Sequence, residues 1–154
     1  MLGLPTRCNF ADDSMTSEDG WLLDPQLARD SAAVADLALC QVRLMEDANH
    51  PWLLLIPRRP NVSEITDLNE ADRAQLMREI ARAANMLKHL TRCDKINVAA
   101  LGNVVAQLHV HVVARFKSDP AWPKPVWGFA PSRPYEESTR QQLIAAIRGR
   151  LIGE

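Results

Sequence analysis

The stretch QLHVHVVARF, residues 107–116, carries the clearest structural pattern in the chain. Side chains alternate between the two faces of a β-strand. One face would therefore be wholly apolar, formed by Leu108, Val110, Val112, Ala114 and Phe116. The opposite face would carry Gln107, His109, His111, Val113 and Arg115. We expect a strand over residues 108–116 whose apolar face packs under a helix, while two imidazoles about 7 Å apart project together from the other face.

Three further strands are predicted from short apolar runs. Period-two alternation indicates strands over about residues 37–45 and 95–101, and a continuous apolar run indicates a buried strand over residues 52–56. Turn residues at positions 47–51 separate the strands at 37–45 and 52–56, which should therefore form a hairpin. The histidine strand would then join an antiparallel sheet.

Helices are predicted between and around these strands. Apolar residues at helical spacing indicate a long helix that begins after an N-cap at Asn69 and ends near Thr91. Asp24 followed by Pro25 favours a short helix over about residues 26–30, and an amphipathic helix is expected over about residues 136–151. Strands and helices in this order predict an α+β domain with an antiparallel sheet.

The organisation expected is one domain over residues 1–154, with a core at about 37–117. The segment 118–135 is rich in proline and tryptophan, so it should lack regular structure. Large apolar rings are costly to leave in water. We therefore expect Trp122 and Trp127 to dock onto the domain, beside the functional cleft.

Composition excludes several classes of function. The formal net charge is −1, so no strong positive field would attract nucleic acid, and an anionic substrate needs local donors. No apolar run approaches the roughly 18 residues that span a membrane. Residues 1–10 do not have the pattern of a signal peptide. The three cysteines, Cys8, Cys40 and Cys93, form no CxxC motif. A reducing cytoplasm is therefore the expected location.

The histidine pair admits three chemical interpretations. Imidazole has an unperturbed pKa of about 6.5 and is a good nucleophile near neutral pH. A metal site is an alternative, because His-x-His on a strand supplies two ligands. His50, Cys93 or Asp119 would have to supply a third, and none has a spacing that argues for it. A purely structural role would require hydrogen-bond partners for both buried rings.

The same segment resembles the histidine triad motif, His-φ-His-φ-His-φ-φ, with φ apolar and with Gln107 in the place of the first histidine. The similarity covers about residues 37–128. It includes WLLLIPRRP at residues 52–60, the turn at Gly102 and Asn103, and Trp122 followed by proline. The Gln-Leu-His-Val-His core is similar to that of bacterial histidine triad hydrolases. The resemblance implies a histidine triad (HIT)-like fold, with about five antiparallel strands, a long helix packed on them and terminal helices.

The resemblance also implies roles for individual residues. His109 matches the middle histidine, the nucleophile, and His111 matches the third, which binds phosphate or the leaving group. Gln107 would do orienting work for the neighbouring imidazole or a phosphate oxygen, because a carboxamide donates and accepts hydrogen bonds without changing charge.

Four residues are expected to bind the nucleotide. Asn103 and Asn97 match amides that contact phosphate oxygens. Trp52 occupies the position near the nucleotide where the family often has a histidine, and Trp122 belongs to a family-like tryptophan-proline tail. The pattern of the family further implies a homodimer.

The function expected is a nucleotide-phosphate hydrolase or nucleotidyl transferase that acts at an α-phosphate through a covalent nucleotidyl-histidine. Substrates of the resembled family include dinucleoside polyphosphates and nucleoside phosphoramidates. No cofactor or metal should be required, and no Gly-rich phosphate loop is present in the sequence. The alternatives are a nucleotide-binding or regulatory protein with little turnover, and the histidine-based metal site.

Overall fold

A computed structural model of the chain describes residues 20–153. Residues 1–10, which were not expected to form a signal peptide, and Cys8 lie outside the described residues. Cys40 and Cys93 are free and buried. In the described part of the chain, none of the helices has the length and apolar character needed to cross a membrane.

Five strands form one antiparallel sheet, in the spatial order β1-β2-β3-β5-β4. The strands are β1 (Ser31–Asp36), β2 (Cys40–Met45), β3 (Trp52–Pro57), β4 (Lys95–Ala99) and β5 (Val110–Arg115). The predicted hairpin is confirmed as β2 and β3, where Val42 lies opposite Leu55. In the histidine strand, His111 lies opposite Leu54 of β3 on one side and Ala99 of β4 on the other.

Strand β1 was not expected from the sequence, and the strand predicted over residues 37–45 begins only at Cys40. Residues 37–39 instead connect β1 to β2, and Glu79 of the long helix accepts hydrogen bonds from the amides of Leu39 and Cys40. The register between β1 and β2 shifts between Ala33 and Ala35. This irregularity breaks the period-two pattern, and short alanine side chains give little signal for a strand.

The helices confirm the predicted caps. Helix α1 (Pro25–Asp30) follows Asp24, whose side chain accepts from the amide of Gln26. Helix α2 (Glu70–Thr91) follows Asn69, whose side chain accepts from the amide of Asp72. Helix α3 (Glu137–Ile152) follows Glu136, and a 3-10 turn, η1 (Ile65–Asp67), precedes α2.

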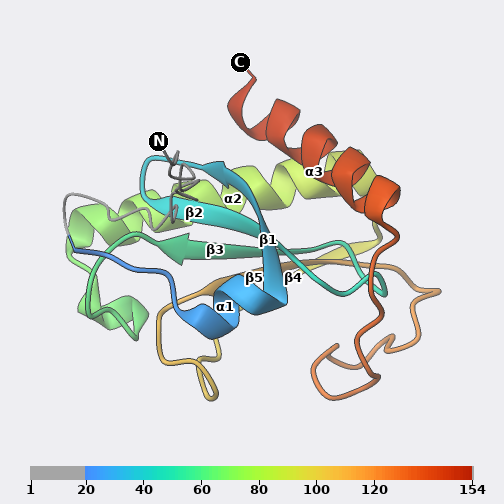
Figure 1. Ribbon diagram of the computed structural model, residues 1–154, viewed down its shortest axis with the longest axis horizontal. Coiled ribbons are helices and arrows are strands. Elements are labelled where there is room, and N and C mark those ends of the chain that lie inside the picture. Colours follow the sequence, from blue (N-terminus) through green and yellow to red (C-terminus); the bar gives the residue numbers. More distant parts are fainter. Residues whose placement is uncertain (1–19, 154) are drawn as a thin grey trace, which may run out of the picture.

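The two faces of the sheet are covered differently (Figure 1). Helices α2 and α3 pack on one face, as predicted for the apolar side of β5. That core joins Val110, Val112 and Ala114 to Leu76, Ala83 and Ile147. The opposite face has a smaller apolar cluster, formed by Trp21, Leu27, Trp52, Leu54, Ile56, Val113, Ala121 and Val126. Two segments far apart in sequence, around α1 and around residues 118–128, therefore each cover part of the face that carries the histidines.

Candidate functional site

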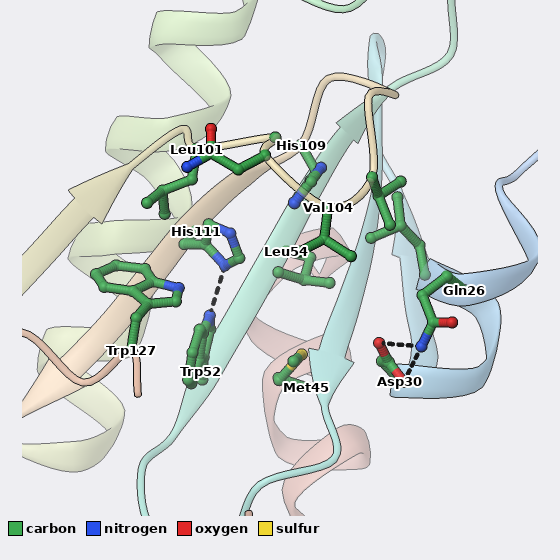
Figure 2. Close-up of a pocket in the computed structure, with 14 residues that line it drawn as sticks. Gln26, Asp30, Met45, Trp52, Leu54, Leu101, Val104, His109, His111 and Trp127 are labelled. Carbon is green, nitrogen blue, oxygen red and sulfur yellow. Dashed lines mark hydrogen bonds between the residues drawn. The ribbon is translucent and has the colours of Figure 1, made fainter. Parts of the chain in front are cut away.

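A pocket of about 390 Å³ lies on the histidine face of the sheet (Figure 2). His111 lines it from β5, His109 lines it from the residue just before that strand, and Leu54 forms its floor from β3. Helix α1 closes one end, and Trp127 of the proline- and tryptophan-rich segment lies at the other. Alternation along residues 107–116 therefore predicted correctly that both imidazoles share one face.

The ring of His109 is held by the main chain. Its Nδ1 lies 2.7 Å from the carbonyl oxygen of Gln107. A carbonyl oxygen only accepts hydrogen bonds, so Nδ1 carries the ring proton in the neutral imidazole. The lone pair of His109 is then on Nε2, which is the nitrogen available as a nucleophile.

The ring of His111 has the opposite arrangement. The indole Nε1–H of Trp52 donates to Nδ1 of His111 at 2.9 Å. Because an indole N–H only donates, Nδ1 of His111 must be unprotonated, and its Nε2 carries the proton as a hydrogen-bond donor. Burial, reinforced by the nearby His109, lowers the pKa of His111 from 6.5 to about 4. His111 is therefore a neutral donor at physiological pH.

Aromatic rings surround this donor. The ring centroids of His109 and His111 are 5.0 Å apart, with an interplanar angle of 75°. Trp127 makes edge contacts with His111 at 5.2 Å and with Trp52 at 5.5 Å. These contacts restrict the orientation of His111 in addition to its hydrogen bond, and they limit access of water on that side.

Gln107 contributes to the site through two different groups. Its main-chain carbonyl accepts from His109, whereas its carboxamide holds the segment before α1. The side-chain Oε1 accepts from the amide of Asp24 at 2.9 Å, and Nε2 donates to the carbonyl of Leu22 at 2.8 Å. The side chain therefore positions one wall of the pocket, a contact that the sequence pattern did not reveal.

Of the four residues predicted to bind the nucleotide, two line the pocket and two do not. Asn103 and Trp52 line the pocket. Asn97 lies on β4 opposite Val113, but its Oδ1 accepts from Arg115 at 2.7 Å. The ring of Trp122 lies under the guanidinium of Arg115, 5.8 Å from its centroid, and not among the residues that line the pocket. Trp127 lines it instead.

Arg115 connects the histidine strand to the segment that carries Trp127. It is almost fully buried and donates to both carboxylate oxygens of Asp119, at 2.8 and 3.1 Å, and to the carbonyl of Lys124 at 2.8 Å. Burial alone would raise the pKa of Asp119, but hydrogen bonds from Arg115 and from the amide of Phe116 outweigh it and lower that pKa to about 2. The segment is thereby fixed by an ionised pair.

The three residues considered as a third metal ligand lie elsewhere. The carboxylate of Asp119 is engaged by Arg115, and Nδ1 of His50 lies 3.9 Å from it. Cys93 follows the C-terminal end of α2 and is buried in the hydrophobic core. Across residues 20–153, no group of three or more histidine, cysteine, aspartate or glutamate side chains is arranged to hold a metal ion.

Comparison with solved structures shows close relatives. A histidine triad protein from Bradyrhizobium japonicum is 49% identical, with a TM-score of 0.84, over 85% of this chain and 98% of that one. A second, from Sinorhizobium meliloti 1021, is 45% identical, with a TM-score of 0.83, over 84% and 96% of the two chains. A third, from Marinobacter aquaeolei VT8, is 39% identical, with a TM-score of 0.83, over 85% and 96%.

Comparison by sequence agrees with this similarity. An AP-4-A phosphorylase from Mycobacterium tuberculosis is 36% identical over 77 residues, which are 46% of this chain and 39% of that protein. The match therefore spans about two fifths of the length of that relative. The HIT domain matches residues 26–118, which include α1 except for its first residue, the whole sheet, α2 and both histidines. The chain therefore belongs to the HIT-domain family.

Proposed function

We propose that the chain is a nucleotide-phosphate hydrolase or nucleotidyl transferase that acts at an α-phosphate through a covalent bond to His109. The observation that carries the proposal is the opposite protonation of the two rings. His109 offers a lone pair on Nε2, and His111 offers a proton on Nε2, at one pocket. Similarity to an AP-4-A phosphorylase supports a nucleotide as substrate.

In the first step, Nε2 of His109 attacks the α-phosphorus. A new N–P bond forms while the bond from phosphorus to the leaving group breaks, and the leaving group departs with that electron pair. The Nε2–H of His111 donates to a phosphate oxygen or to the departing atom, where negative charge develops. Because phosphoryl transfer depends mainly on positioning and charge stabilisation, fixed neutral donors can contribute strongly in a partly dry pocket.

In the second step, water or another acceptor attacks the nucleotidyl-imidazole. The N–P bond breaks, its electron pair returns to Nε2 of His109, and the attacking oxygen loses its proton to solvent. With water, the product is a nucleoside monophosphate. Dinucleoside polyphosphates and nucleoside phosphoramidates both contain the α-phosphate that this sequence requires. No step calls for a metal, so we expect turnover to continue in EDTA.

The test is to trap and map the intermediate. Wild-type protein, mixed with a phosphate-labelled nucleotide conjugate in EDTA and denatured rapidly, should carry a nucleotidyl group on the peptide that contains His109. His109→Ala should form no adduct and lose turnover by roughly 10⁴-fold or more, because the nucleophile is gone. It should still bind nucleotide.

A matched control is His89→Ala, which removes an exposed histidine on α2. It should behave as wild type. Nucleotide binding by the wild type without adduct or turnover would instead support a binding or regulatory protein. Loss of activity in EDTA that zinc restores would support a metal site.

A further inference from the structure

The end of the pocket formed by α1 carries a polar pair that the reaction at His109 does not use. Gln26 and Asp30 both line the pocket, and Figure 2 shows them across Met45 and Leu54 from His111 and Trp52. Among the described residues that line this pocket, Asp30 is the one with an acidic side chain. A carboxylate in a pocket with mainly apolar walls can accept hydrogen bonds from a ligand as well as from its protein partner.

The carboxylate is held in a fixed orientation. The Nε2 of Gln26 lies 2.9 Å from Oδ1 and 2.8 Å from Oδ2 of Asp30. Gln26 is itself fixed from outside, since a guanidinium nitrogen of Arg29 donates to its Oε1 at 2.6 Å. The main-chain carbonyl of Asp30 accepts from the amide of Glu46 at 2.9 Å, which ties the end of α1 to the end of β2.

This arrangement leaves acceptor capacity unused. An ionised carboxylate has about four lone-pair sites, and the amide of Gln26 occupies only part of them. The guanidinium of Arg29 donates to the Oε1 of Gln26, and the Nε2 of the same carboxamide donates to Asp30. A ligand in the pocket would therefore meet an acceptor whose position is set before binding.

Charge decides which part of a nucleotide can lie there. A phosphate group would be repelled by Asp30, and the donor of His111 draws it to the opposite end. The apolar side chains of Met45 and Leu54 lie between the two ends, and they suit a flat ring (Figure 2). The base is the part of a nucleotide farthest from its phosphate, so the base would reach α1 while the ribose stays nearer the histidines.

We propose that Asp30, oriented by Gln26, is a specificity-determining residue that accepts a hydrogen bond from the exocyclic amino group of a nucleobase. The inference rests on the proposed function and adds a substrate class to it: nucleotides with an amino-bearing base, such as adenine, are favoured over nucleotides whose base lacks that group.

The experiment measures binding, so it does not depend on turnover. Affinities of wild type and Asp30→Ala are measured for adenosine 5′-monophosphate, purine riboside 5′-monophosphate and 2′-deoxyadenosine 5′-monophosphate. Purine riboside lacks only the amino group, and the deoxynucleotide lacks only a ribose hydroxyl. The matched control is Asp36→Ala, which removes the same charge at the other end of β1 and outside this pocket.

The wild type and Asp36→Ala should bind the adenine nucleotide about tenfold or more tightly than the purine riboside nucleotide, as a hydrogen bond to a charged group implies. Asp30→Ala should reduce that ratio to nearly one. A preference that survives in Asp30→Ala, or none in the wild type, would overturn the inference. Sensitivity to the 2′-hydroxyl that disappears in Asp30→Ala would assign the carboxylate to ribose instead. Failure of all three nucleotides to bind would overturn the proposed function as well.

Discussion

The indole of Trp52 and the imidazole of His111 form one hydrogen-bonded unit across β3 and β5, in which the tryptophan donates to Nδ1 of the histidine at 2.9 Å. The unit fixes which nitrogen of His111 carries its proton. Trp127 packs at the edge of both rings, so the unit is also held sterically. Trp52, the first residue of the buried strand β3, thereby determines which nitrogen of His111 acts as a hydrogen-bond donor.

Trp52→Phe tests this unit, because it keeps an aromatic ring and removes the donor. Losing one hydrogen bond should lower kcat/KM by roughly tenfold. The bond favours neutral His111, so its loss should also raise the pKa of His111. Both effects can be followed by histidine NMR titration and by the pH profile of kcat/KM. Trp127→Phe, which retains the bond, should leave the pKa of His111 nearly unchanged. Equal shifts in the two variants would contradict the assignment.

The pKa of His111 predicts how stability depends on pH. The folded protein holds His111 neutral down to about pH 4, whereas the unfolded chain binds a proton near pH 6.5. Between these pH values the unfolded state binds more protons than the folded state. The contribution of His111 to the free energy of unfolding should therefore be largest above pH 6.5 and decrease as the pH falls to 4. At about 1.4 kcal/mol per pH unit, the loss is on the order of 3 kcal/mol. Urea unfolding of His111→Gln should show a flatter pH dependence; an identical slope would argue against it.

Gln107→Ala should affect binding more than chemistry. The variant removes the two side-chain hydrogen bonds to residues 22 and 24, which position the segment before α1. It retains the main-chain carbonyl that holds His109. We expect KM to rise about tenfold, as the loss of one or two neutral hydrogen bonds implies, with kcat nearly unchanged. Steady-state kinetics distinguish this result from a fall in kcat alone, which would show that the carboxamide acts on the reacting groups.

The two tryptophans of the segment 118–135 should respond differently to ligand. Trp127 lines the pocket and contacts His111, whereas Trp122 packs against Arg115. Adenosine monophosphate should therefore quench tryptophan fluorescence less in Trp127→Phe than in the wild type. Trp122→Phe serves as the control and should retain the full quench. Loss of the ligand response in Trp122→Phe would place the ligand on the other side of the segment.

Arg115→Met should destabilise the protein strongly, because it leaves the buried carboxylate of Asp119 without its charged partner. Breaking such a pair costs about 3–5 kcal/mol. The double variant Arg115→Met/Asp119→Ala should lose less stability than the sum of the losses in the two single variants, because the two residues are coupled. Arg140→Met, which breaks more exposed pairs with Glu46 and Glu137, should cost far less, because solvent screens exposed ion pairs. Urea denaturation of the four variants measures these differences, and additive costs would contradict the coupling.

Much of the fold could be predicted because its patterns are local. Alternation identified the faces of β5, and the caps at Asp24 and Asn69 marked the starts of α1 and α2. Strand β1 was missed because the register shift between Ala33 and Ala35 interrupts its alternation. The predicted ranges of β4 and β5 were longer than the strands in the structure. Strand pairing ends where residues 100–109 leave the sheet to form the loop beside the pocket.

The histidine pair of the site was predictable for the same reason, but its partners were not. The contact from Trp52 to His111 depends on the register between β3 and β5, in which Trp52 lies opposite Val113. The sequence identified a tryptophan-rich segment, yet only its path over the sheet decides that Trp127, and not Trp122, lines the pocket. Asp30 could not be predicted as a site residue from the sequence, because a carboxylate at the end of a short helix is common on protein surfaces.

The bond from His109 to the carbonyl of Gln107 has a consequence for mutational tolerance. Every amino acid has that carbonyl, so no codon change at position 107 can delete the acceptor that selects the nucleophilic nitrogen. Substituting every other amino acid at position 107 would reveal effects on the pocket wall near α1. It would not reveal the contribution of the carbonyl to the position of the proton on His109. An amide-to-ester replacement at the following residue, which weakens the carbonyl as an acceptor, would expose it. Substitutions at position 107 can therefore change the wall of the pocket, while the main chain still determines which nitrogen of His109 carries the proton.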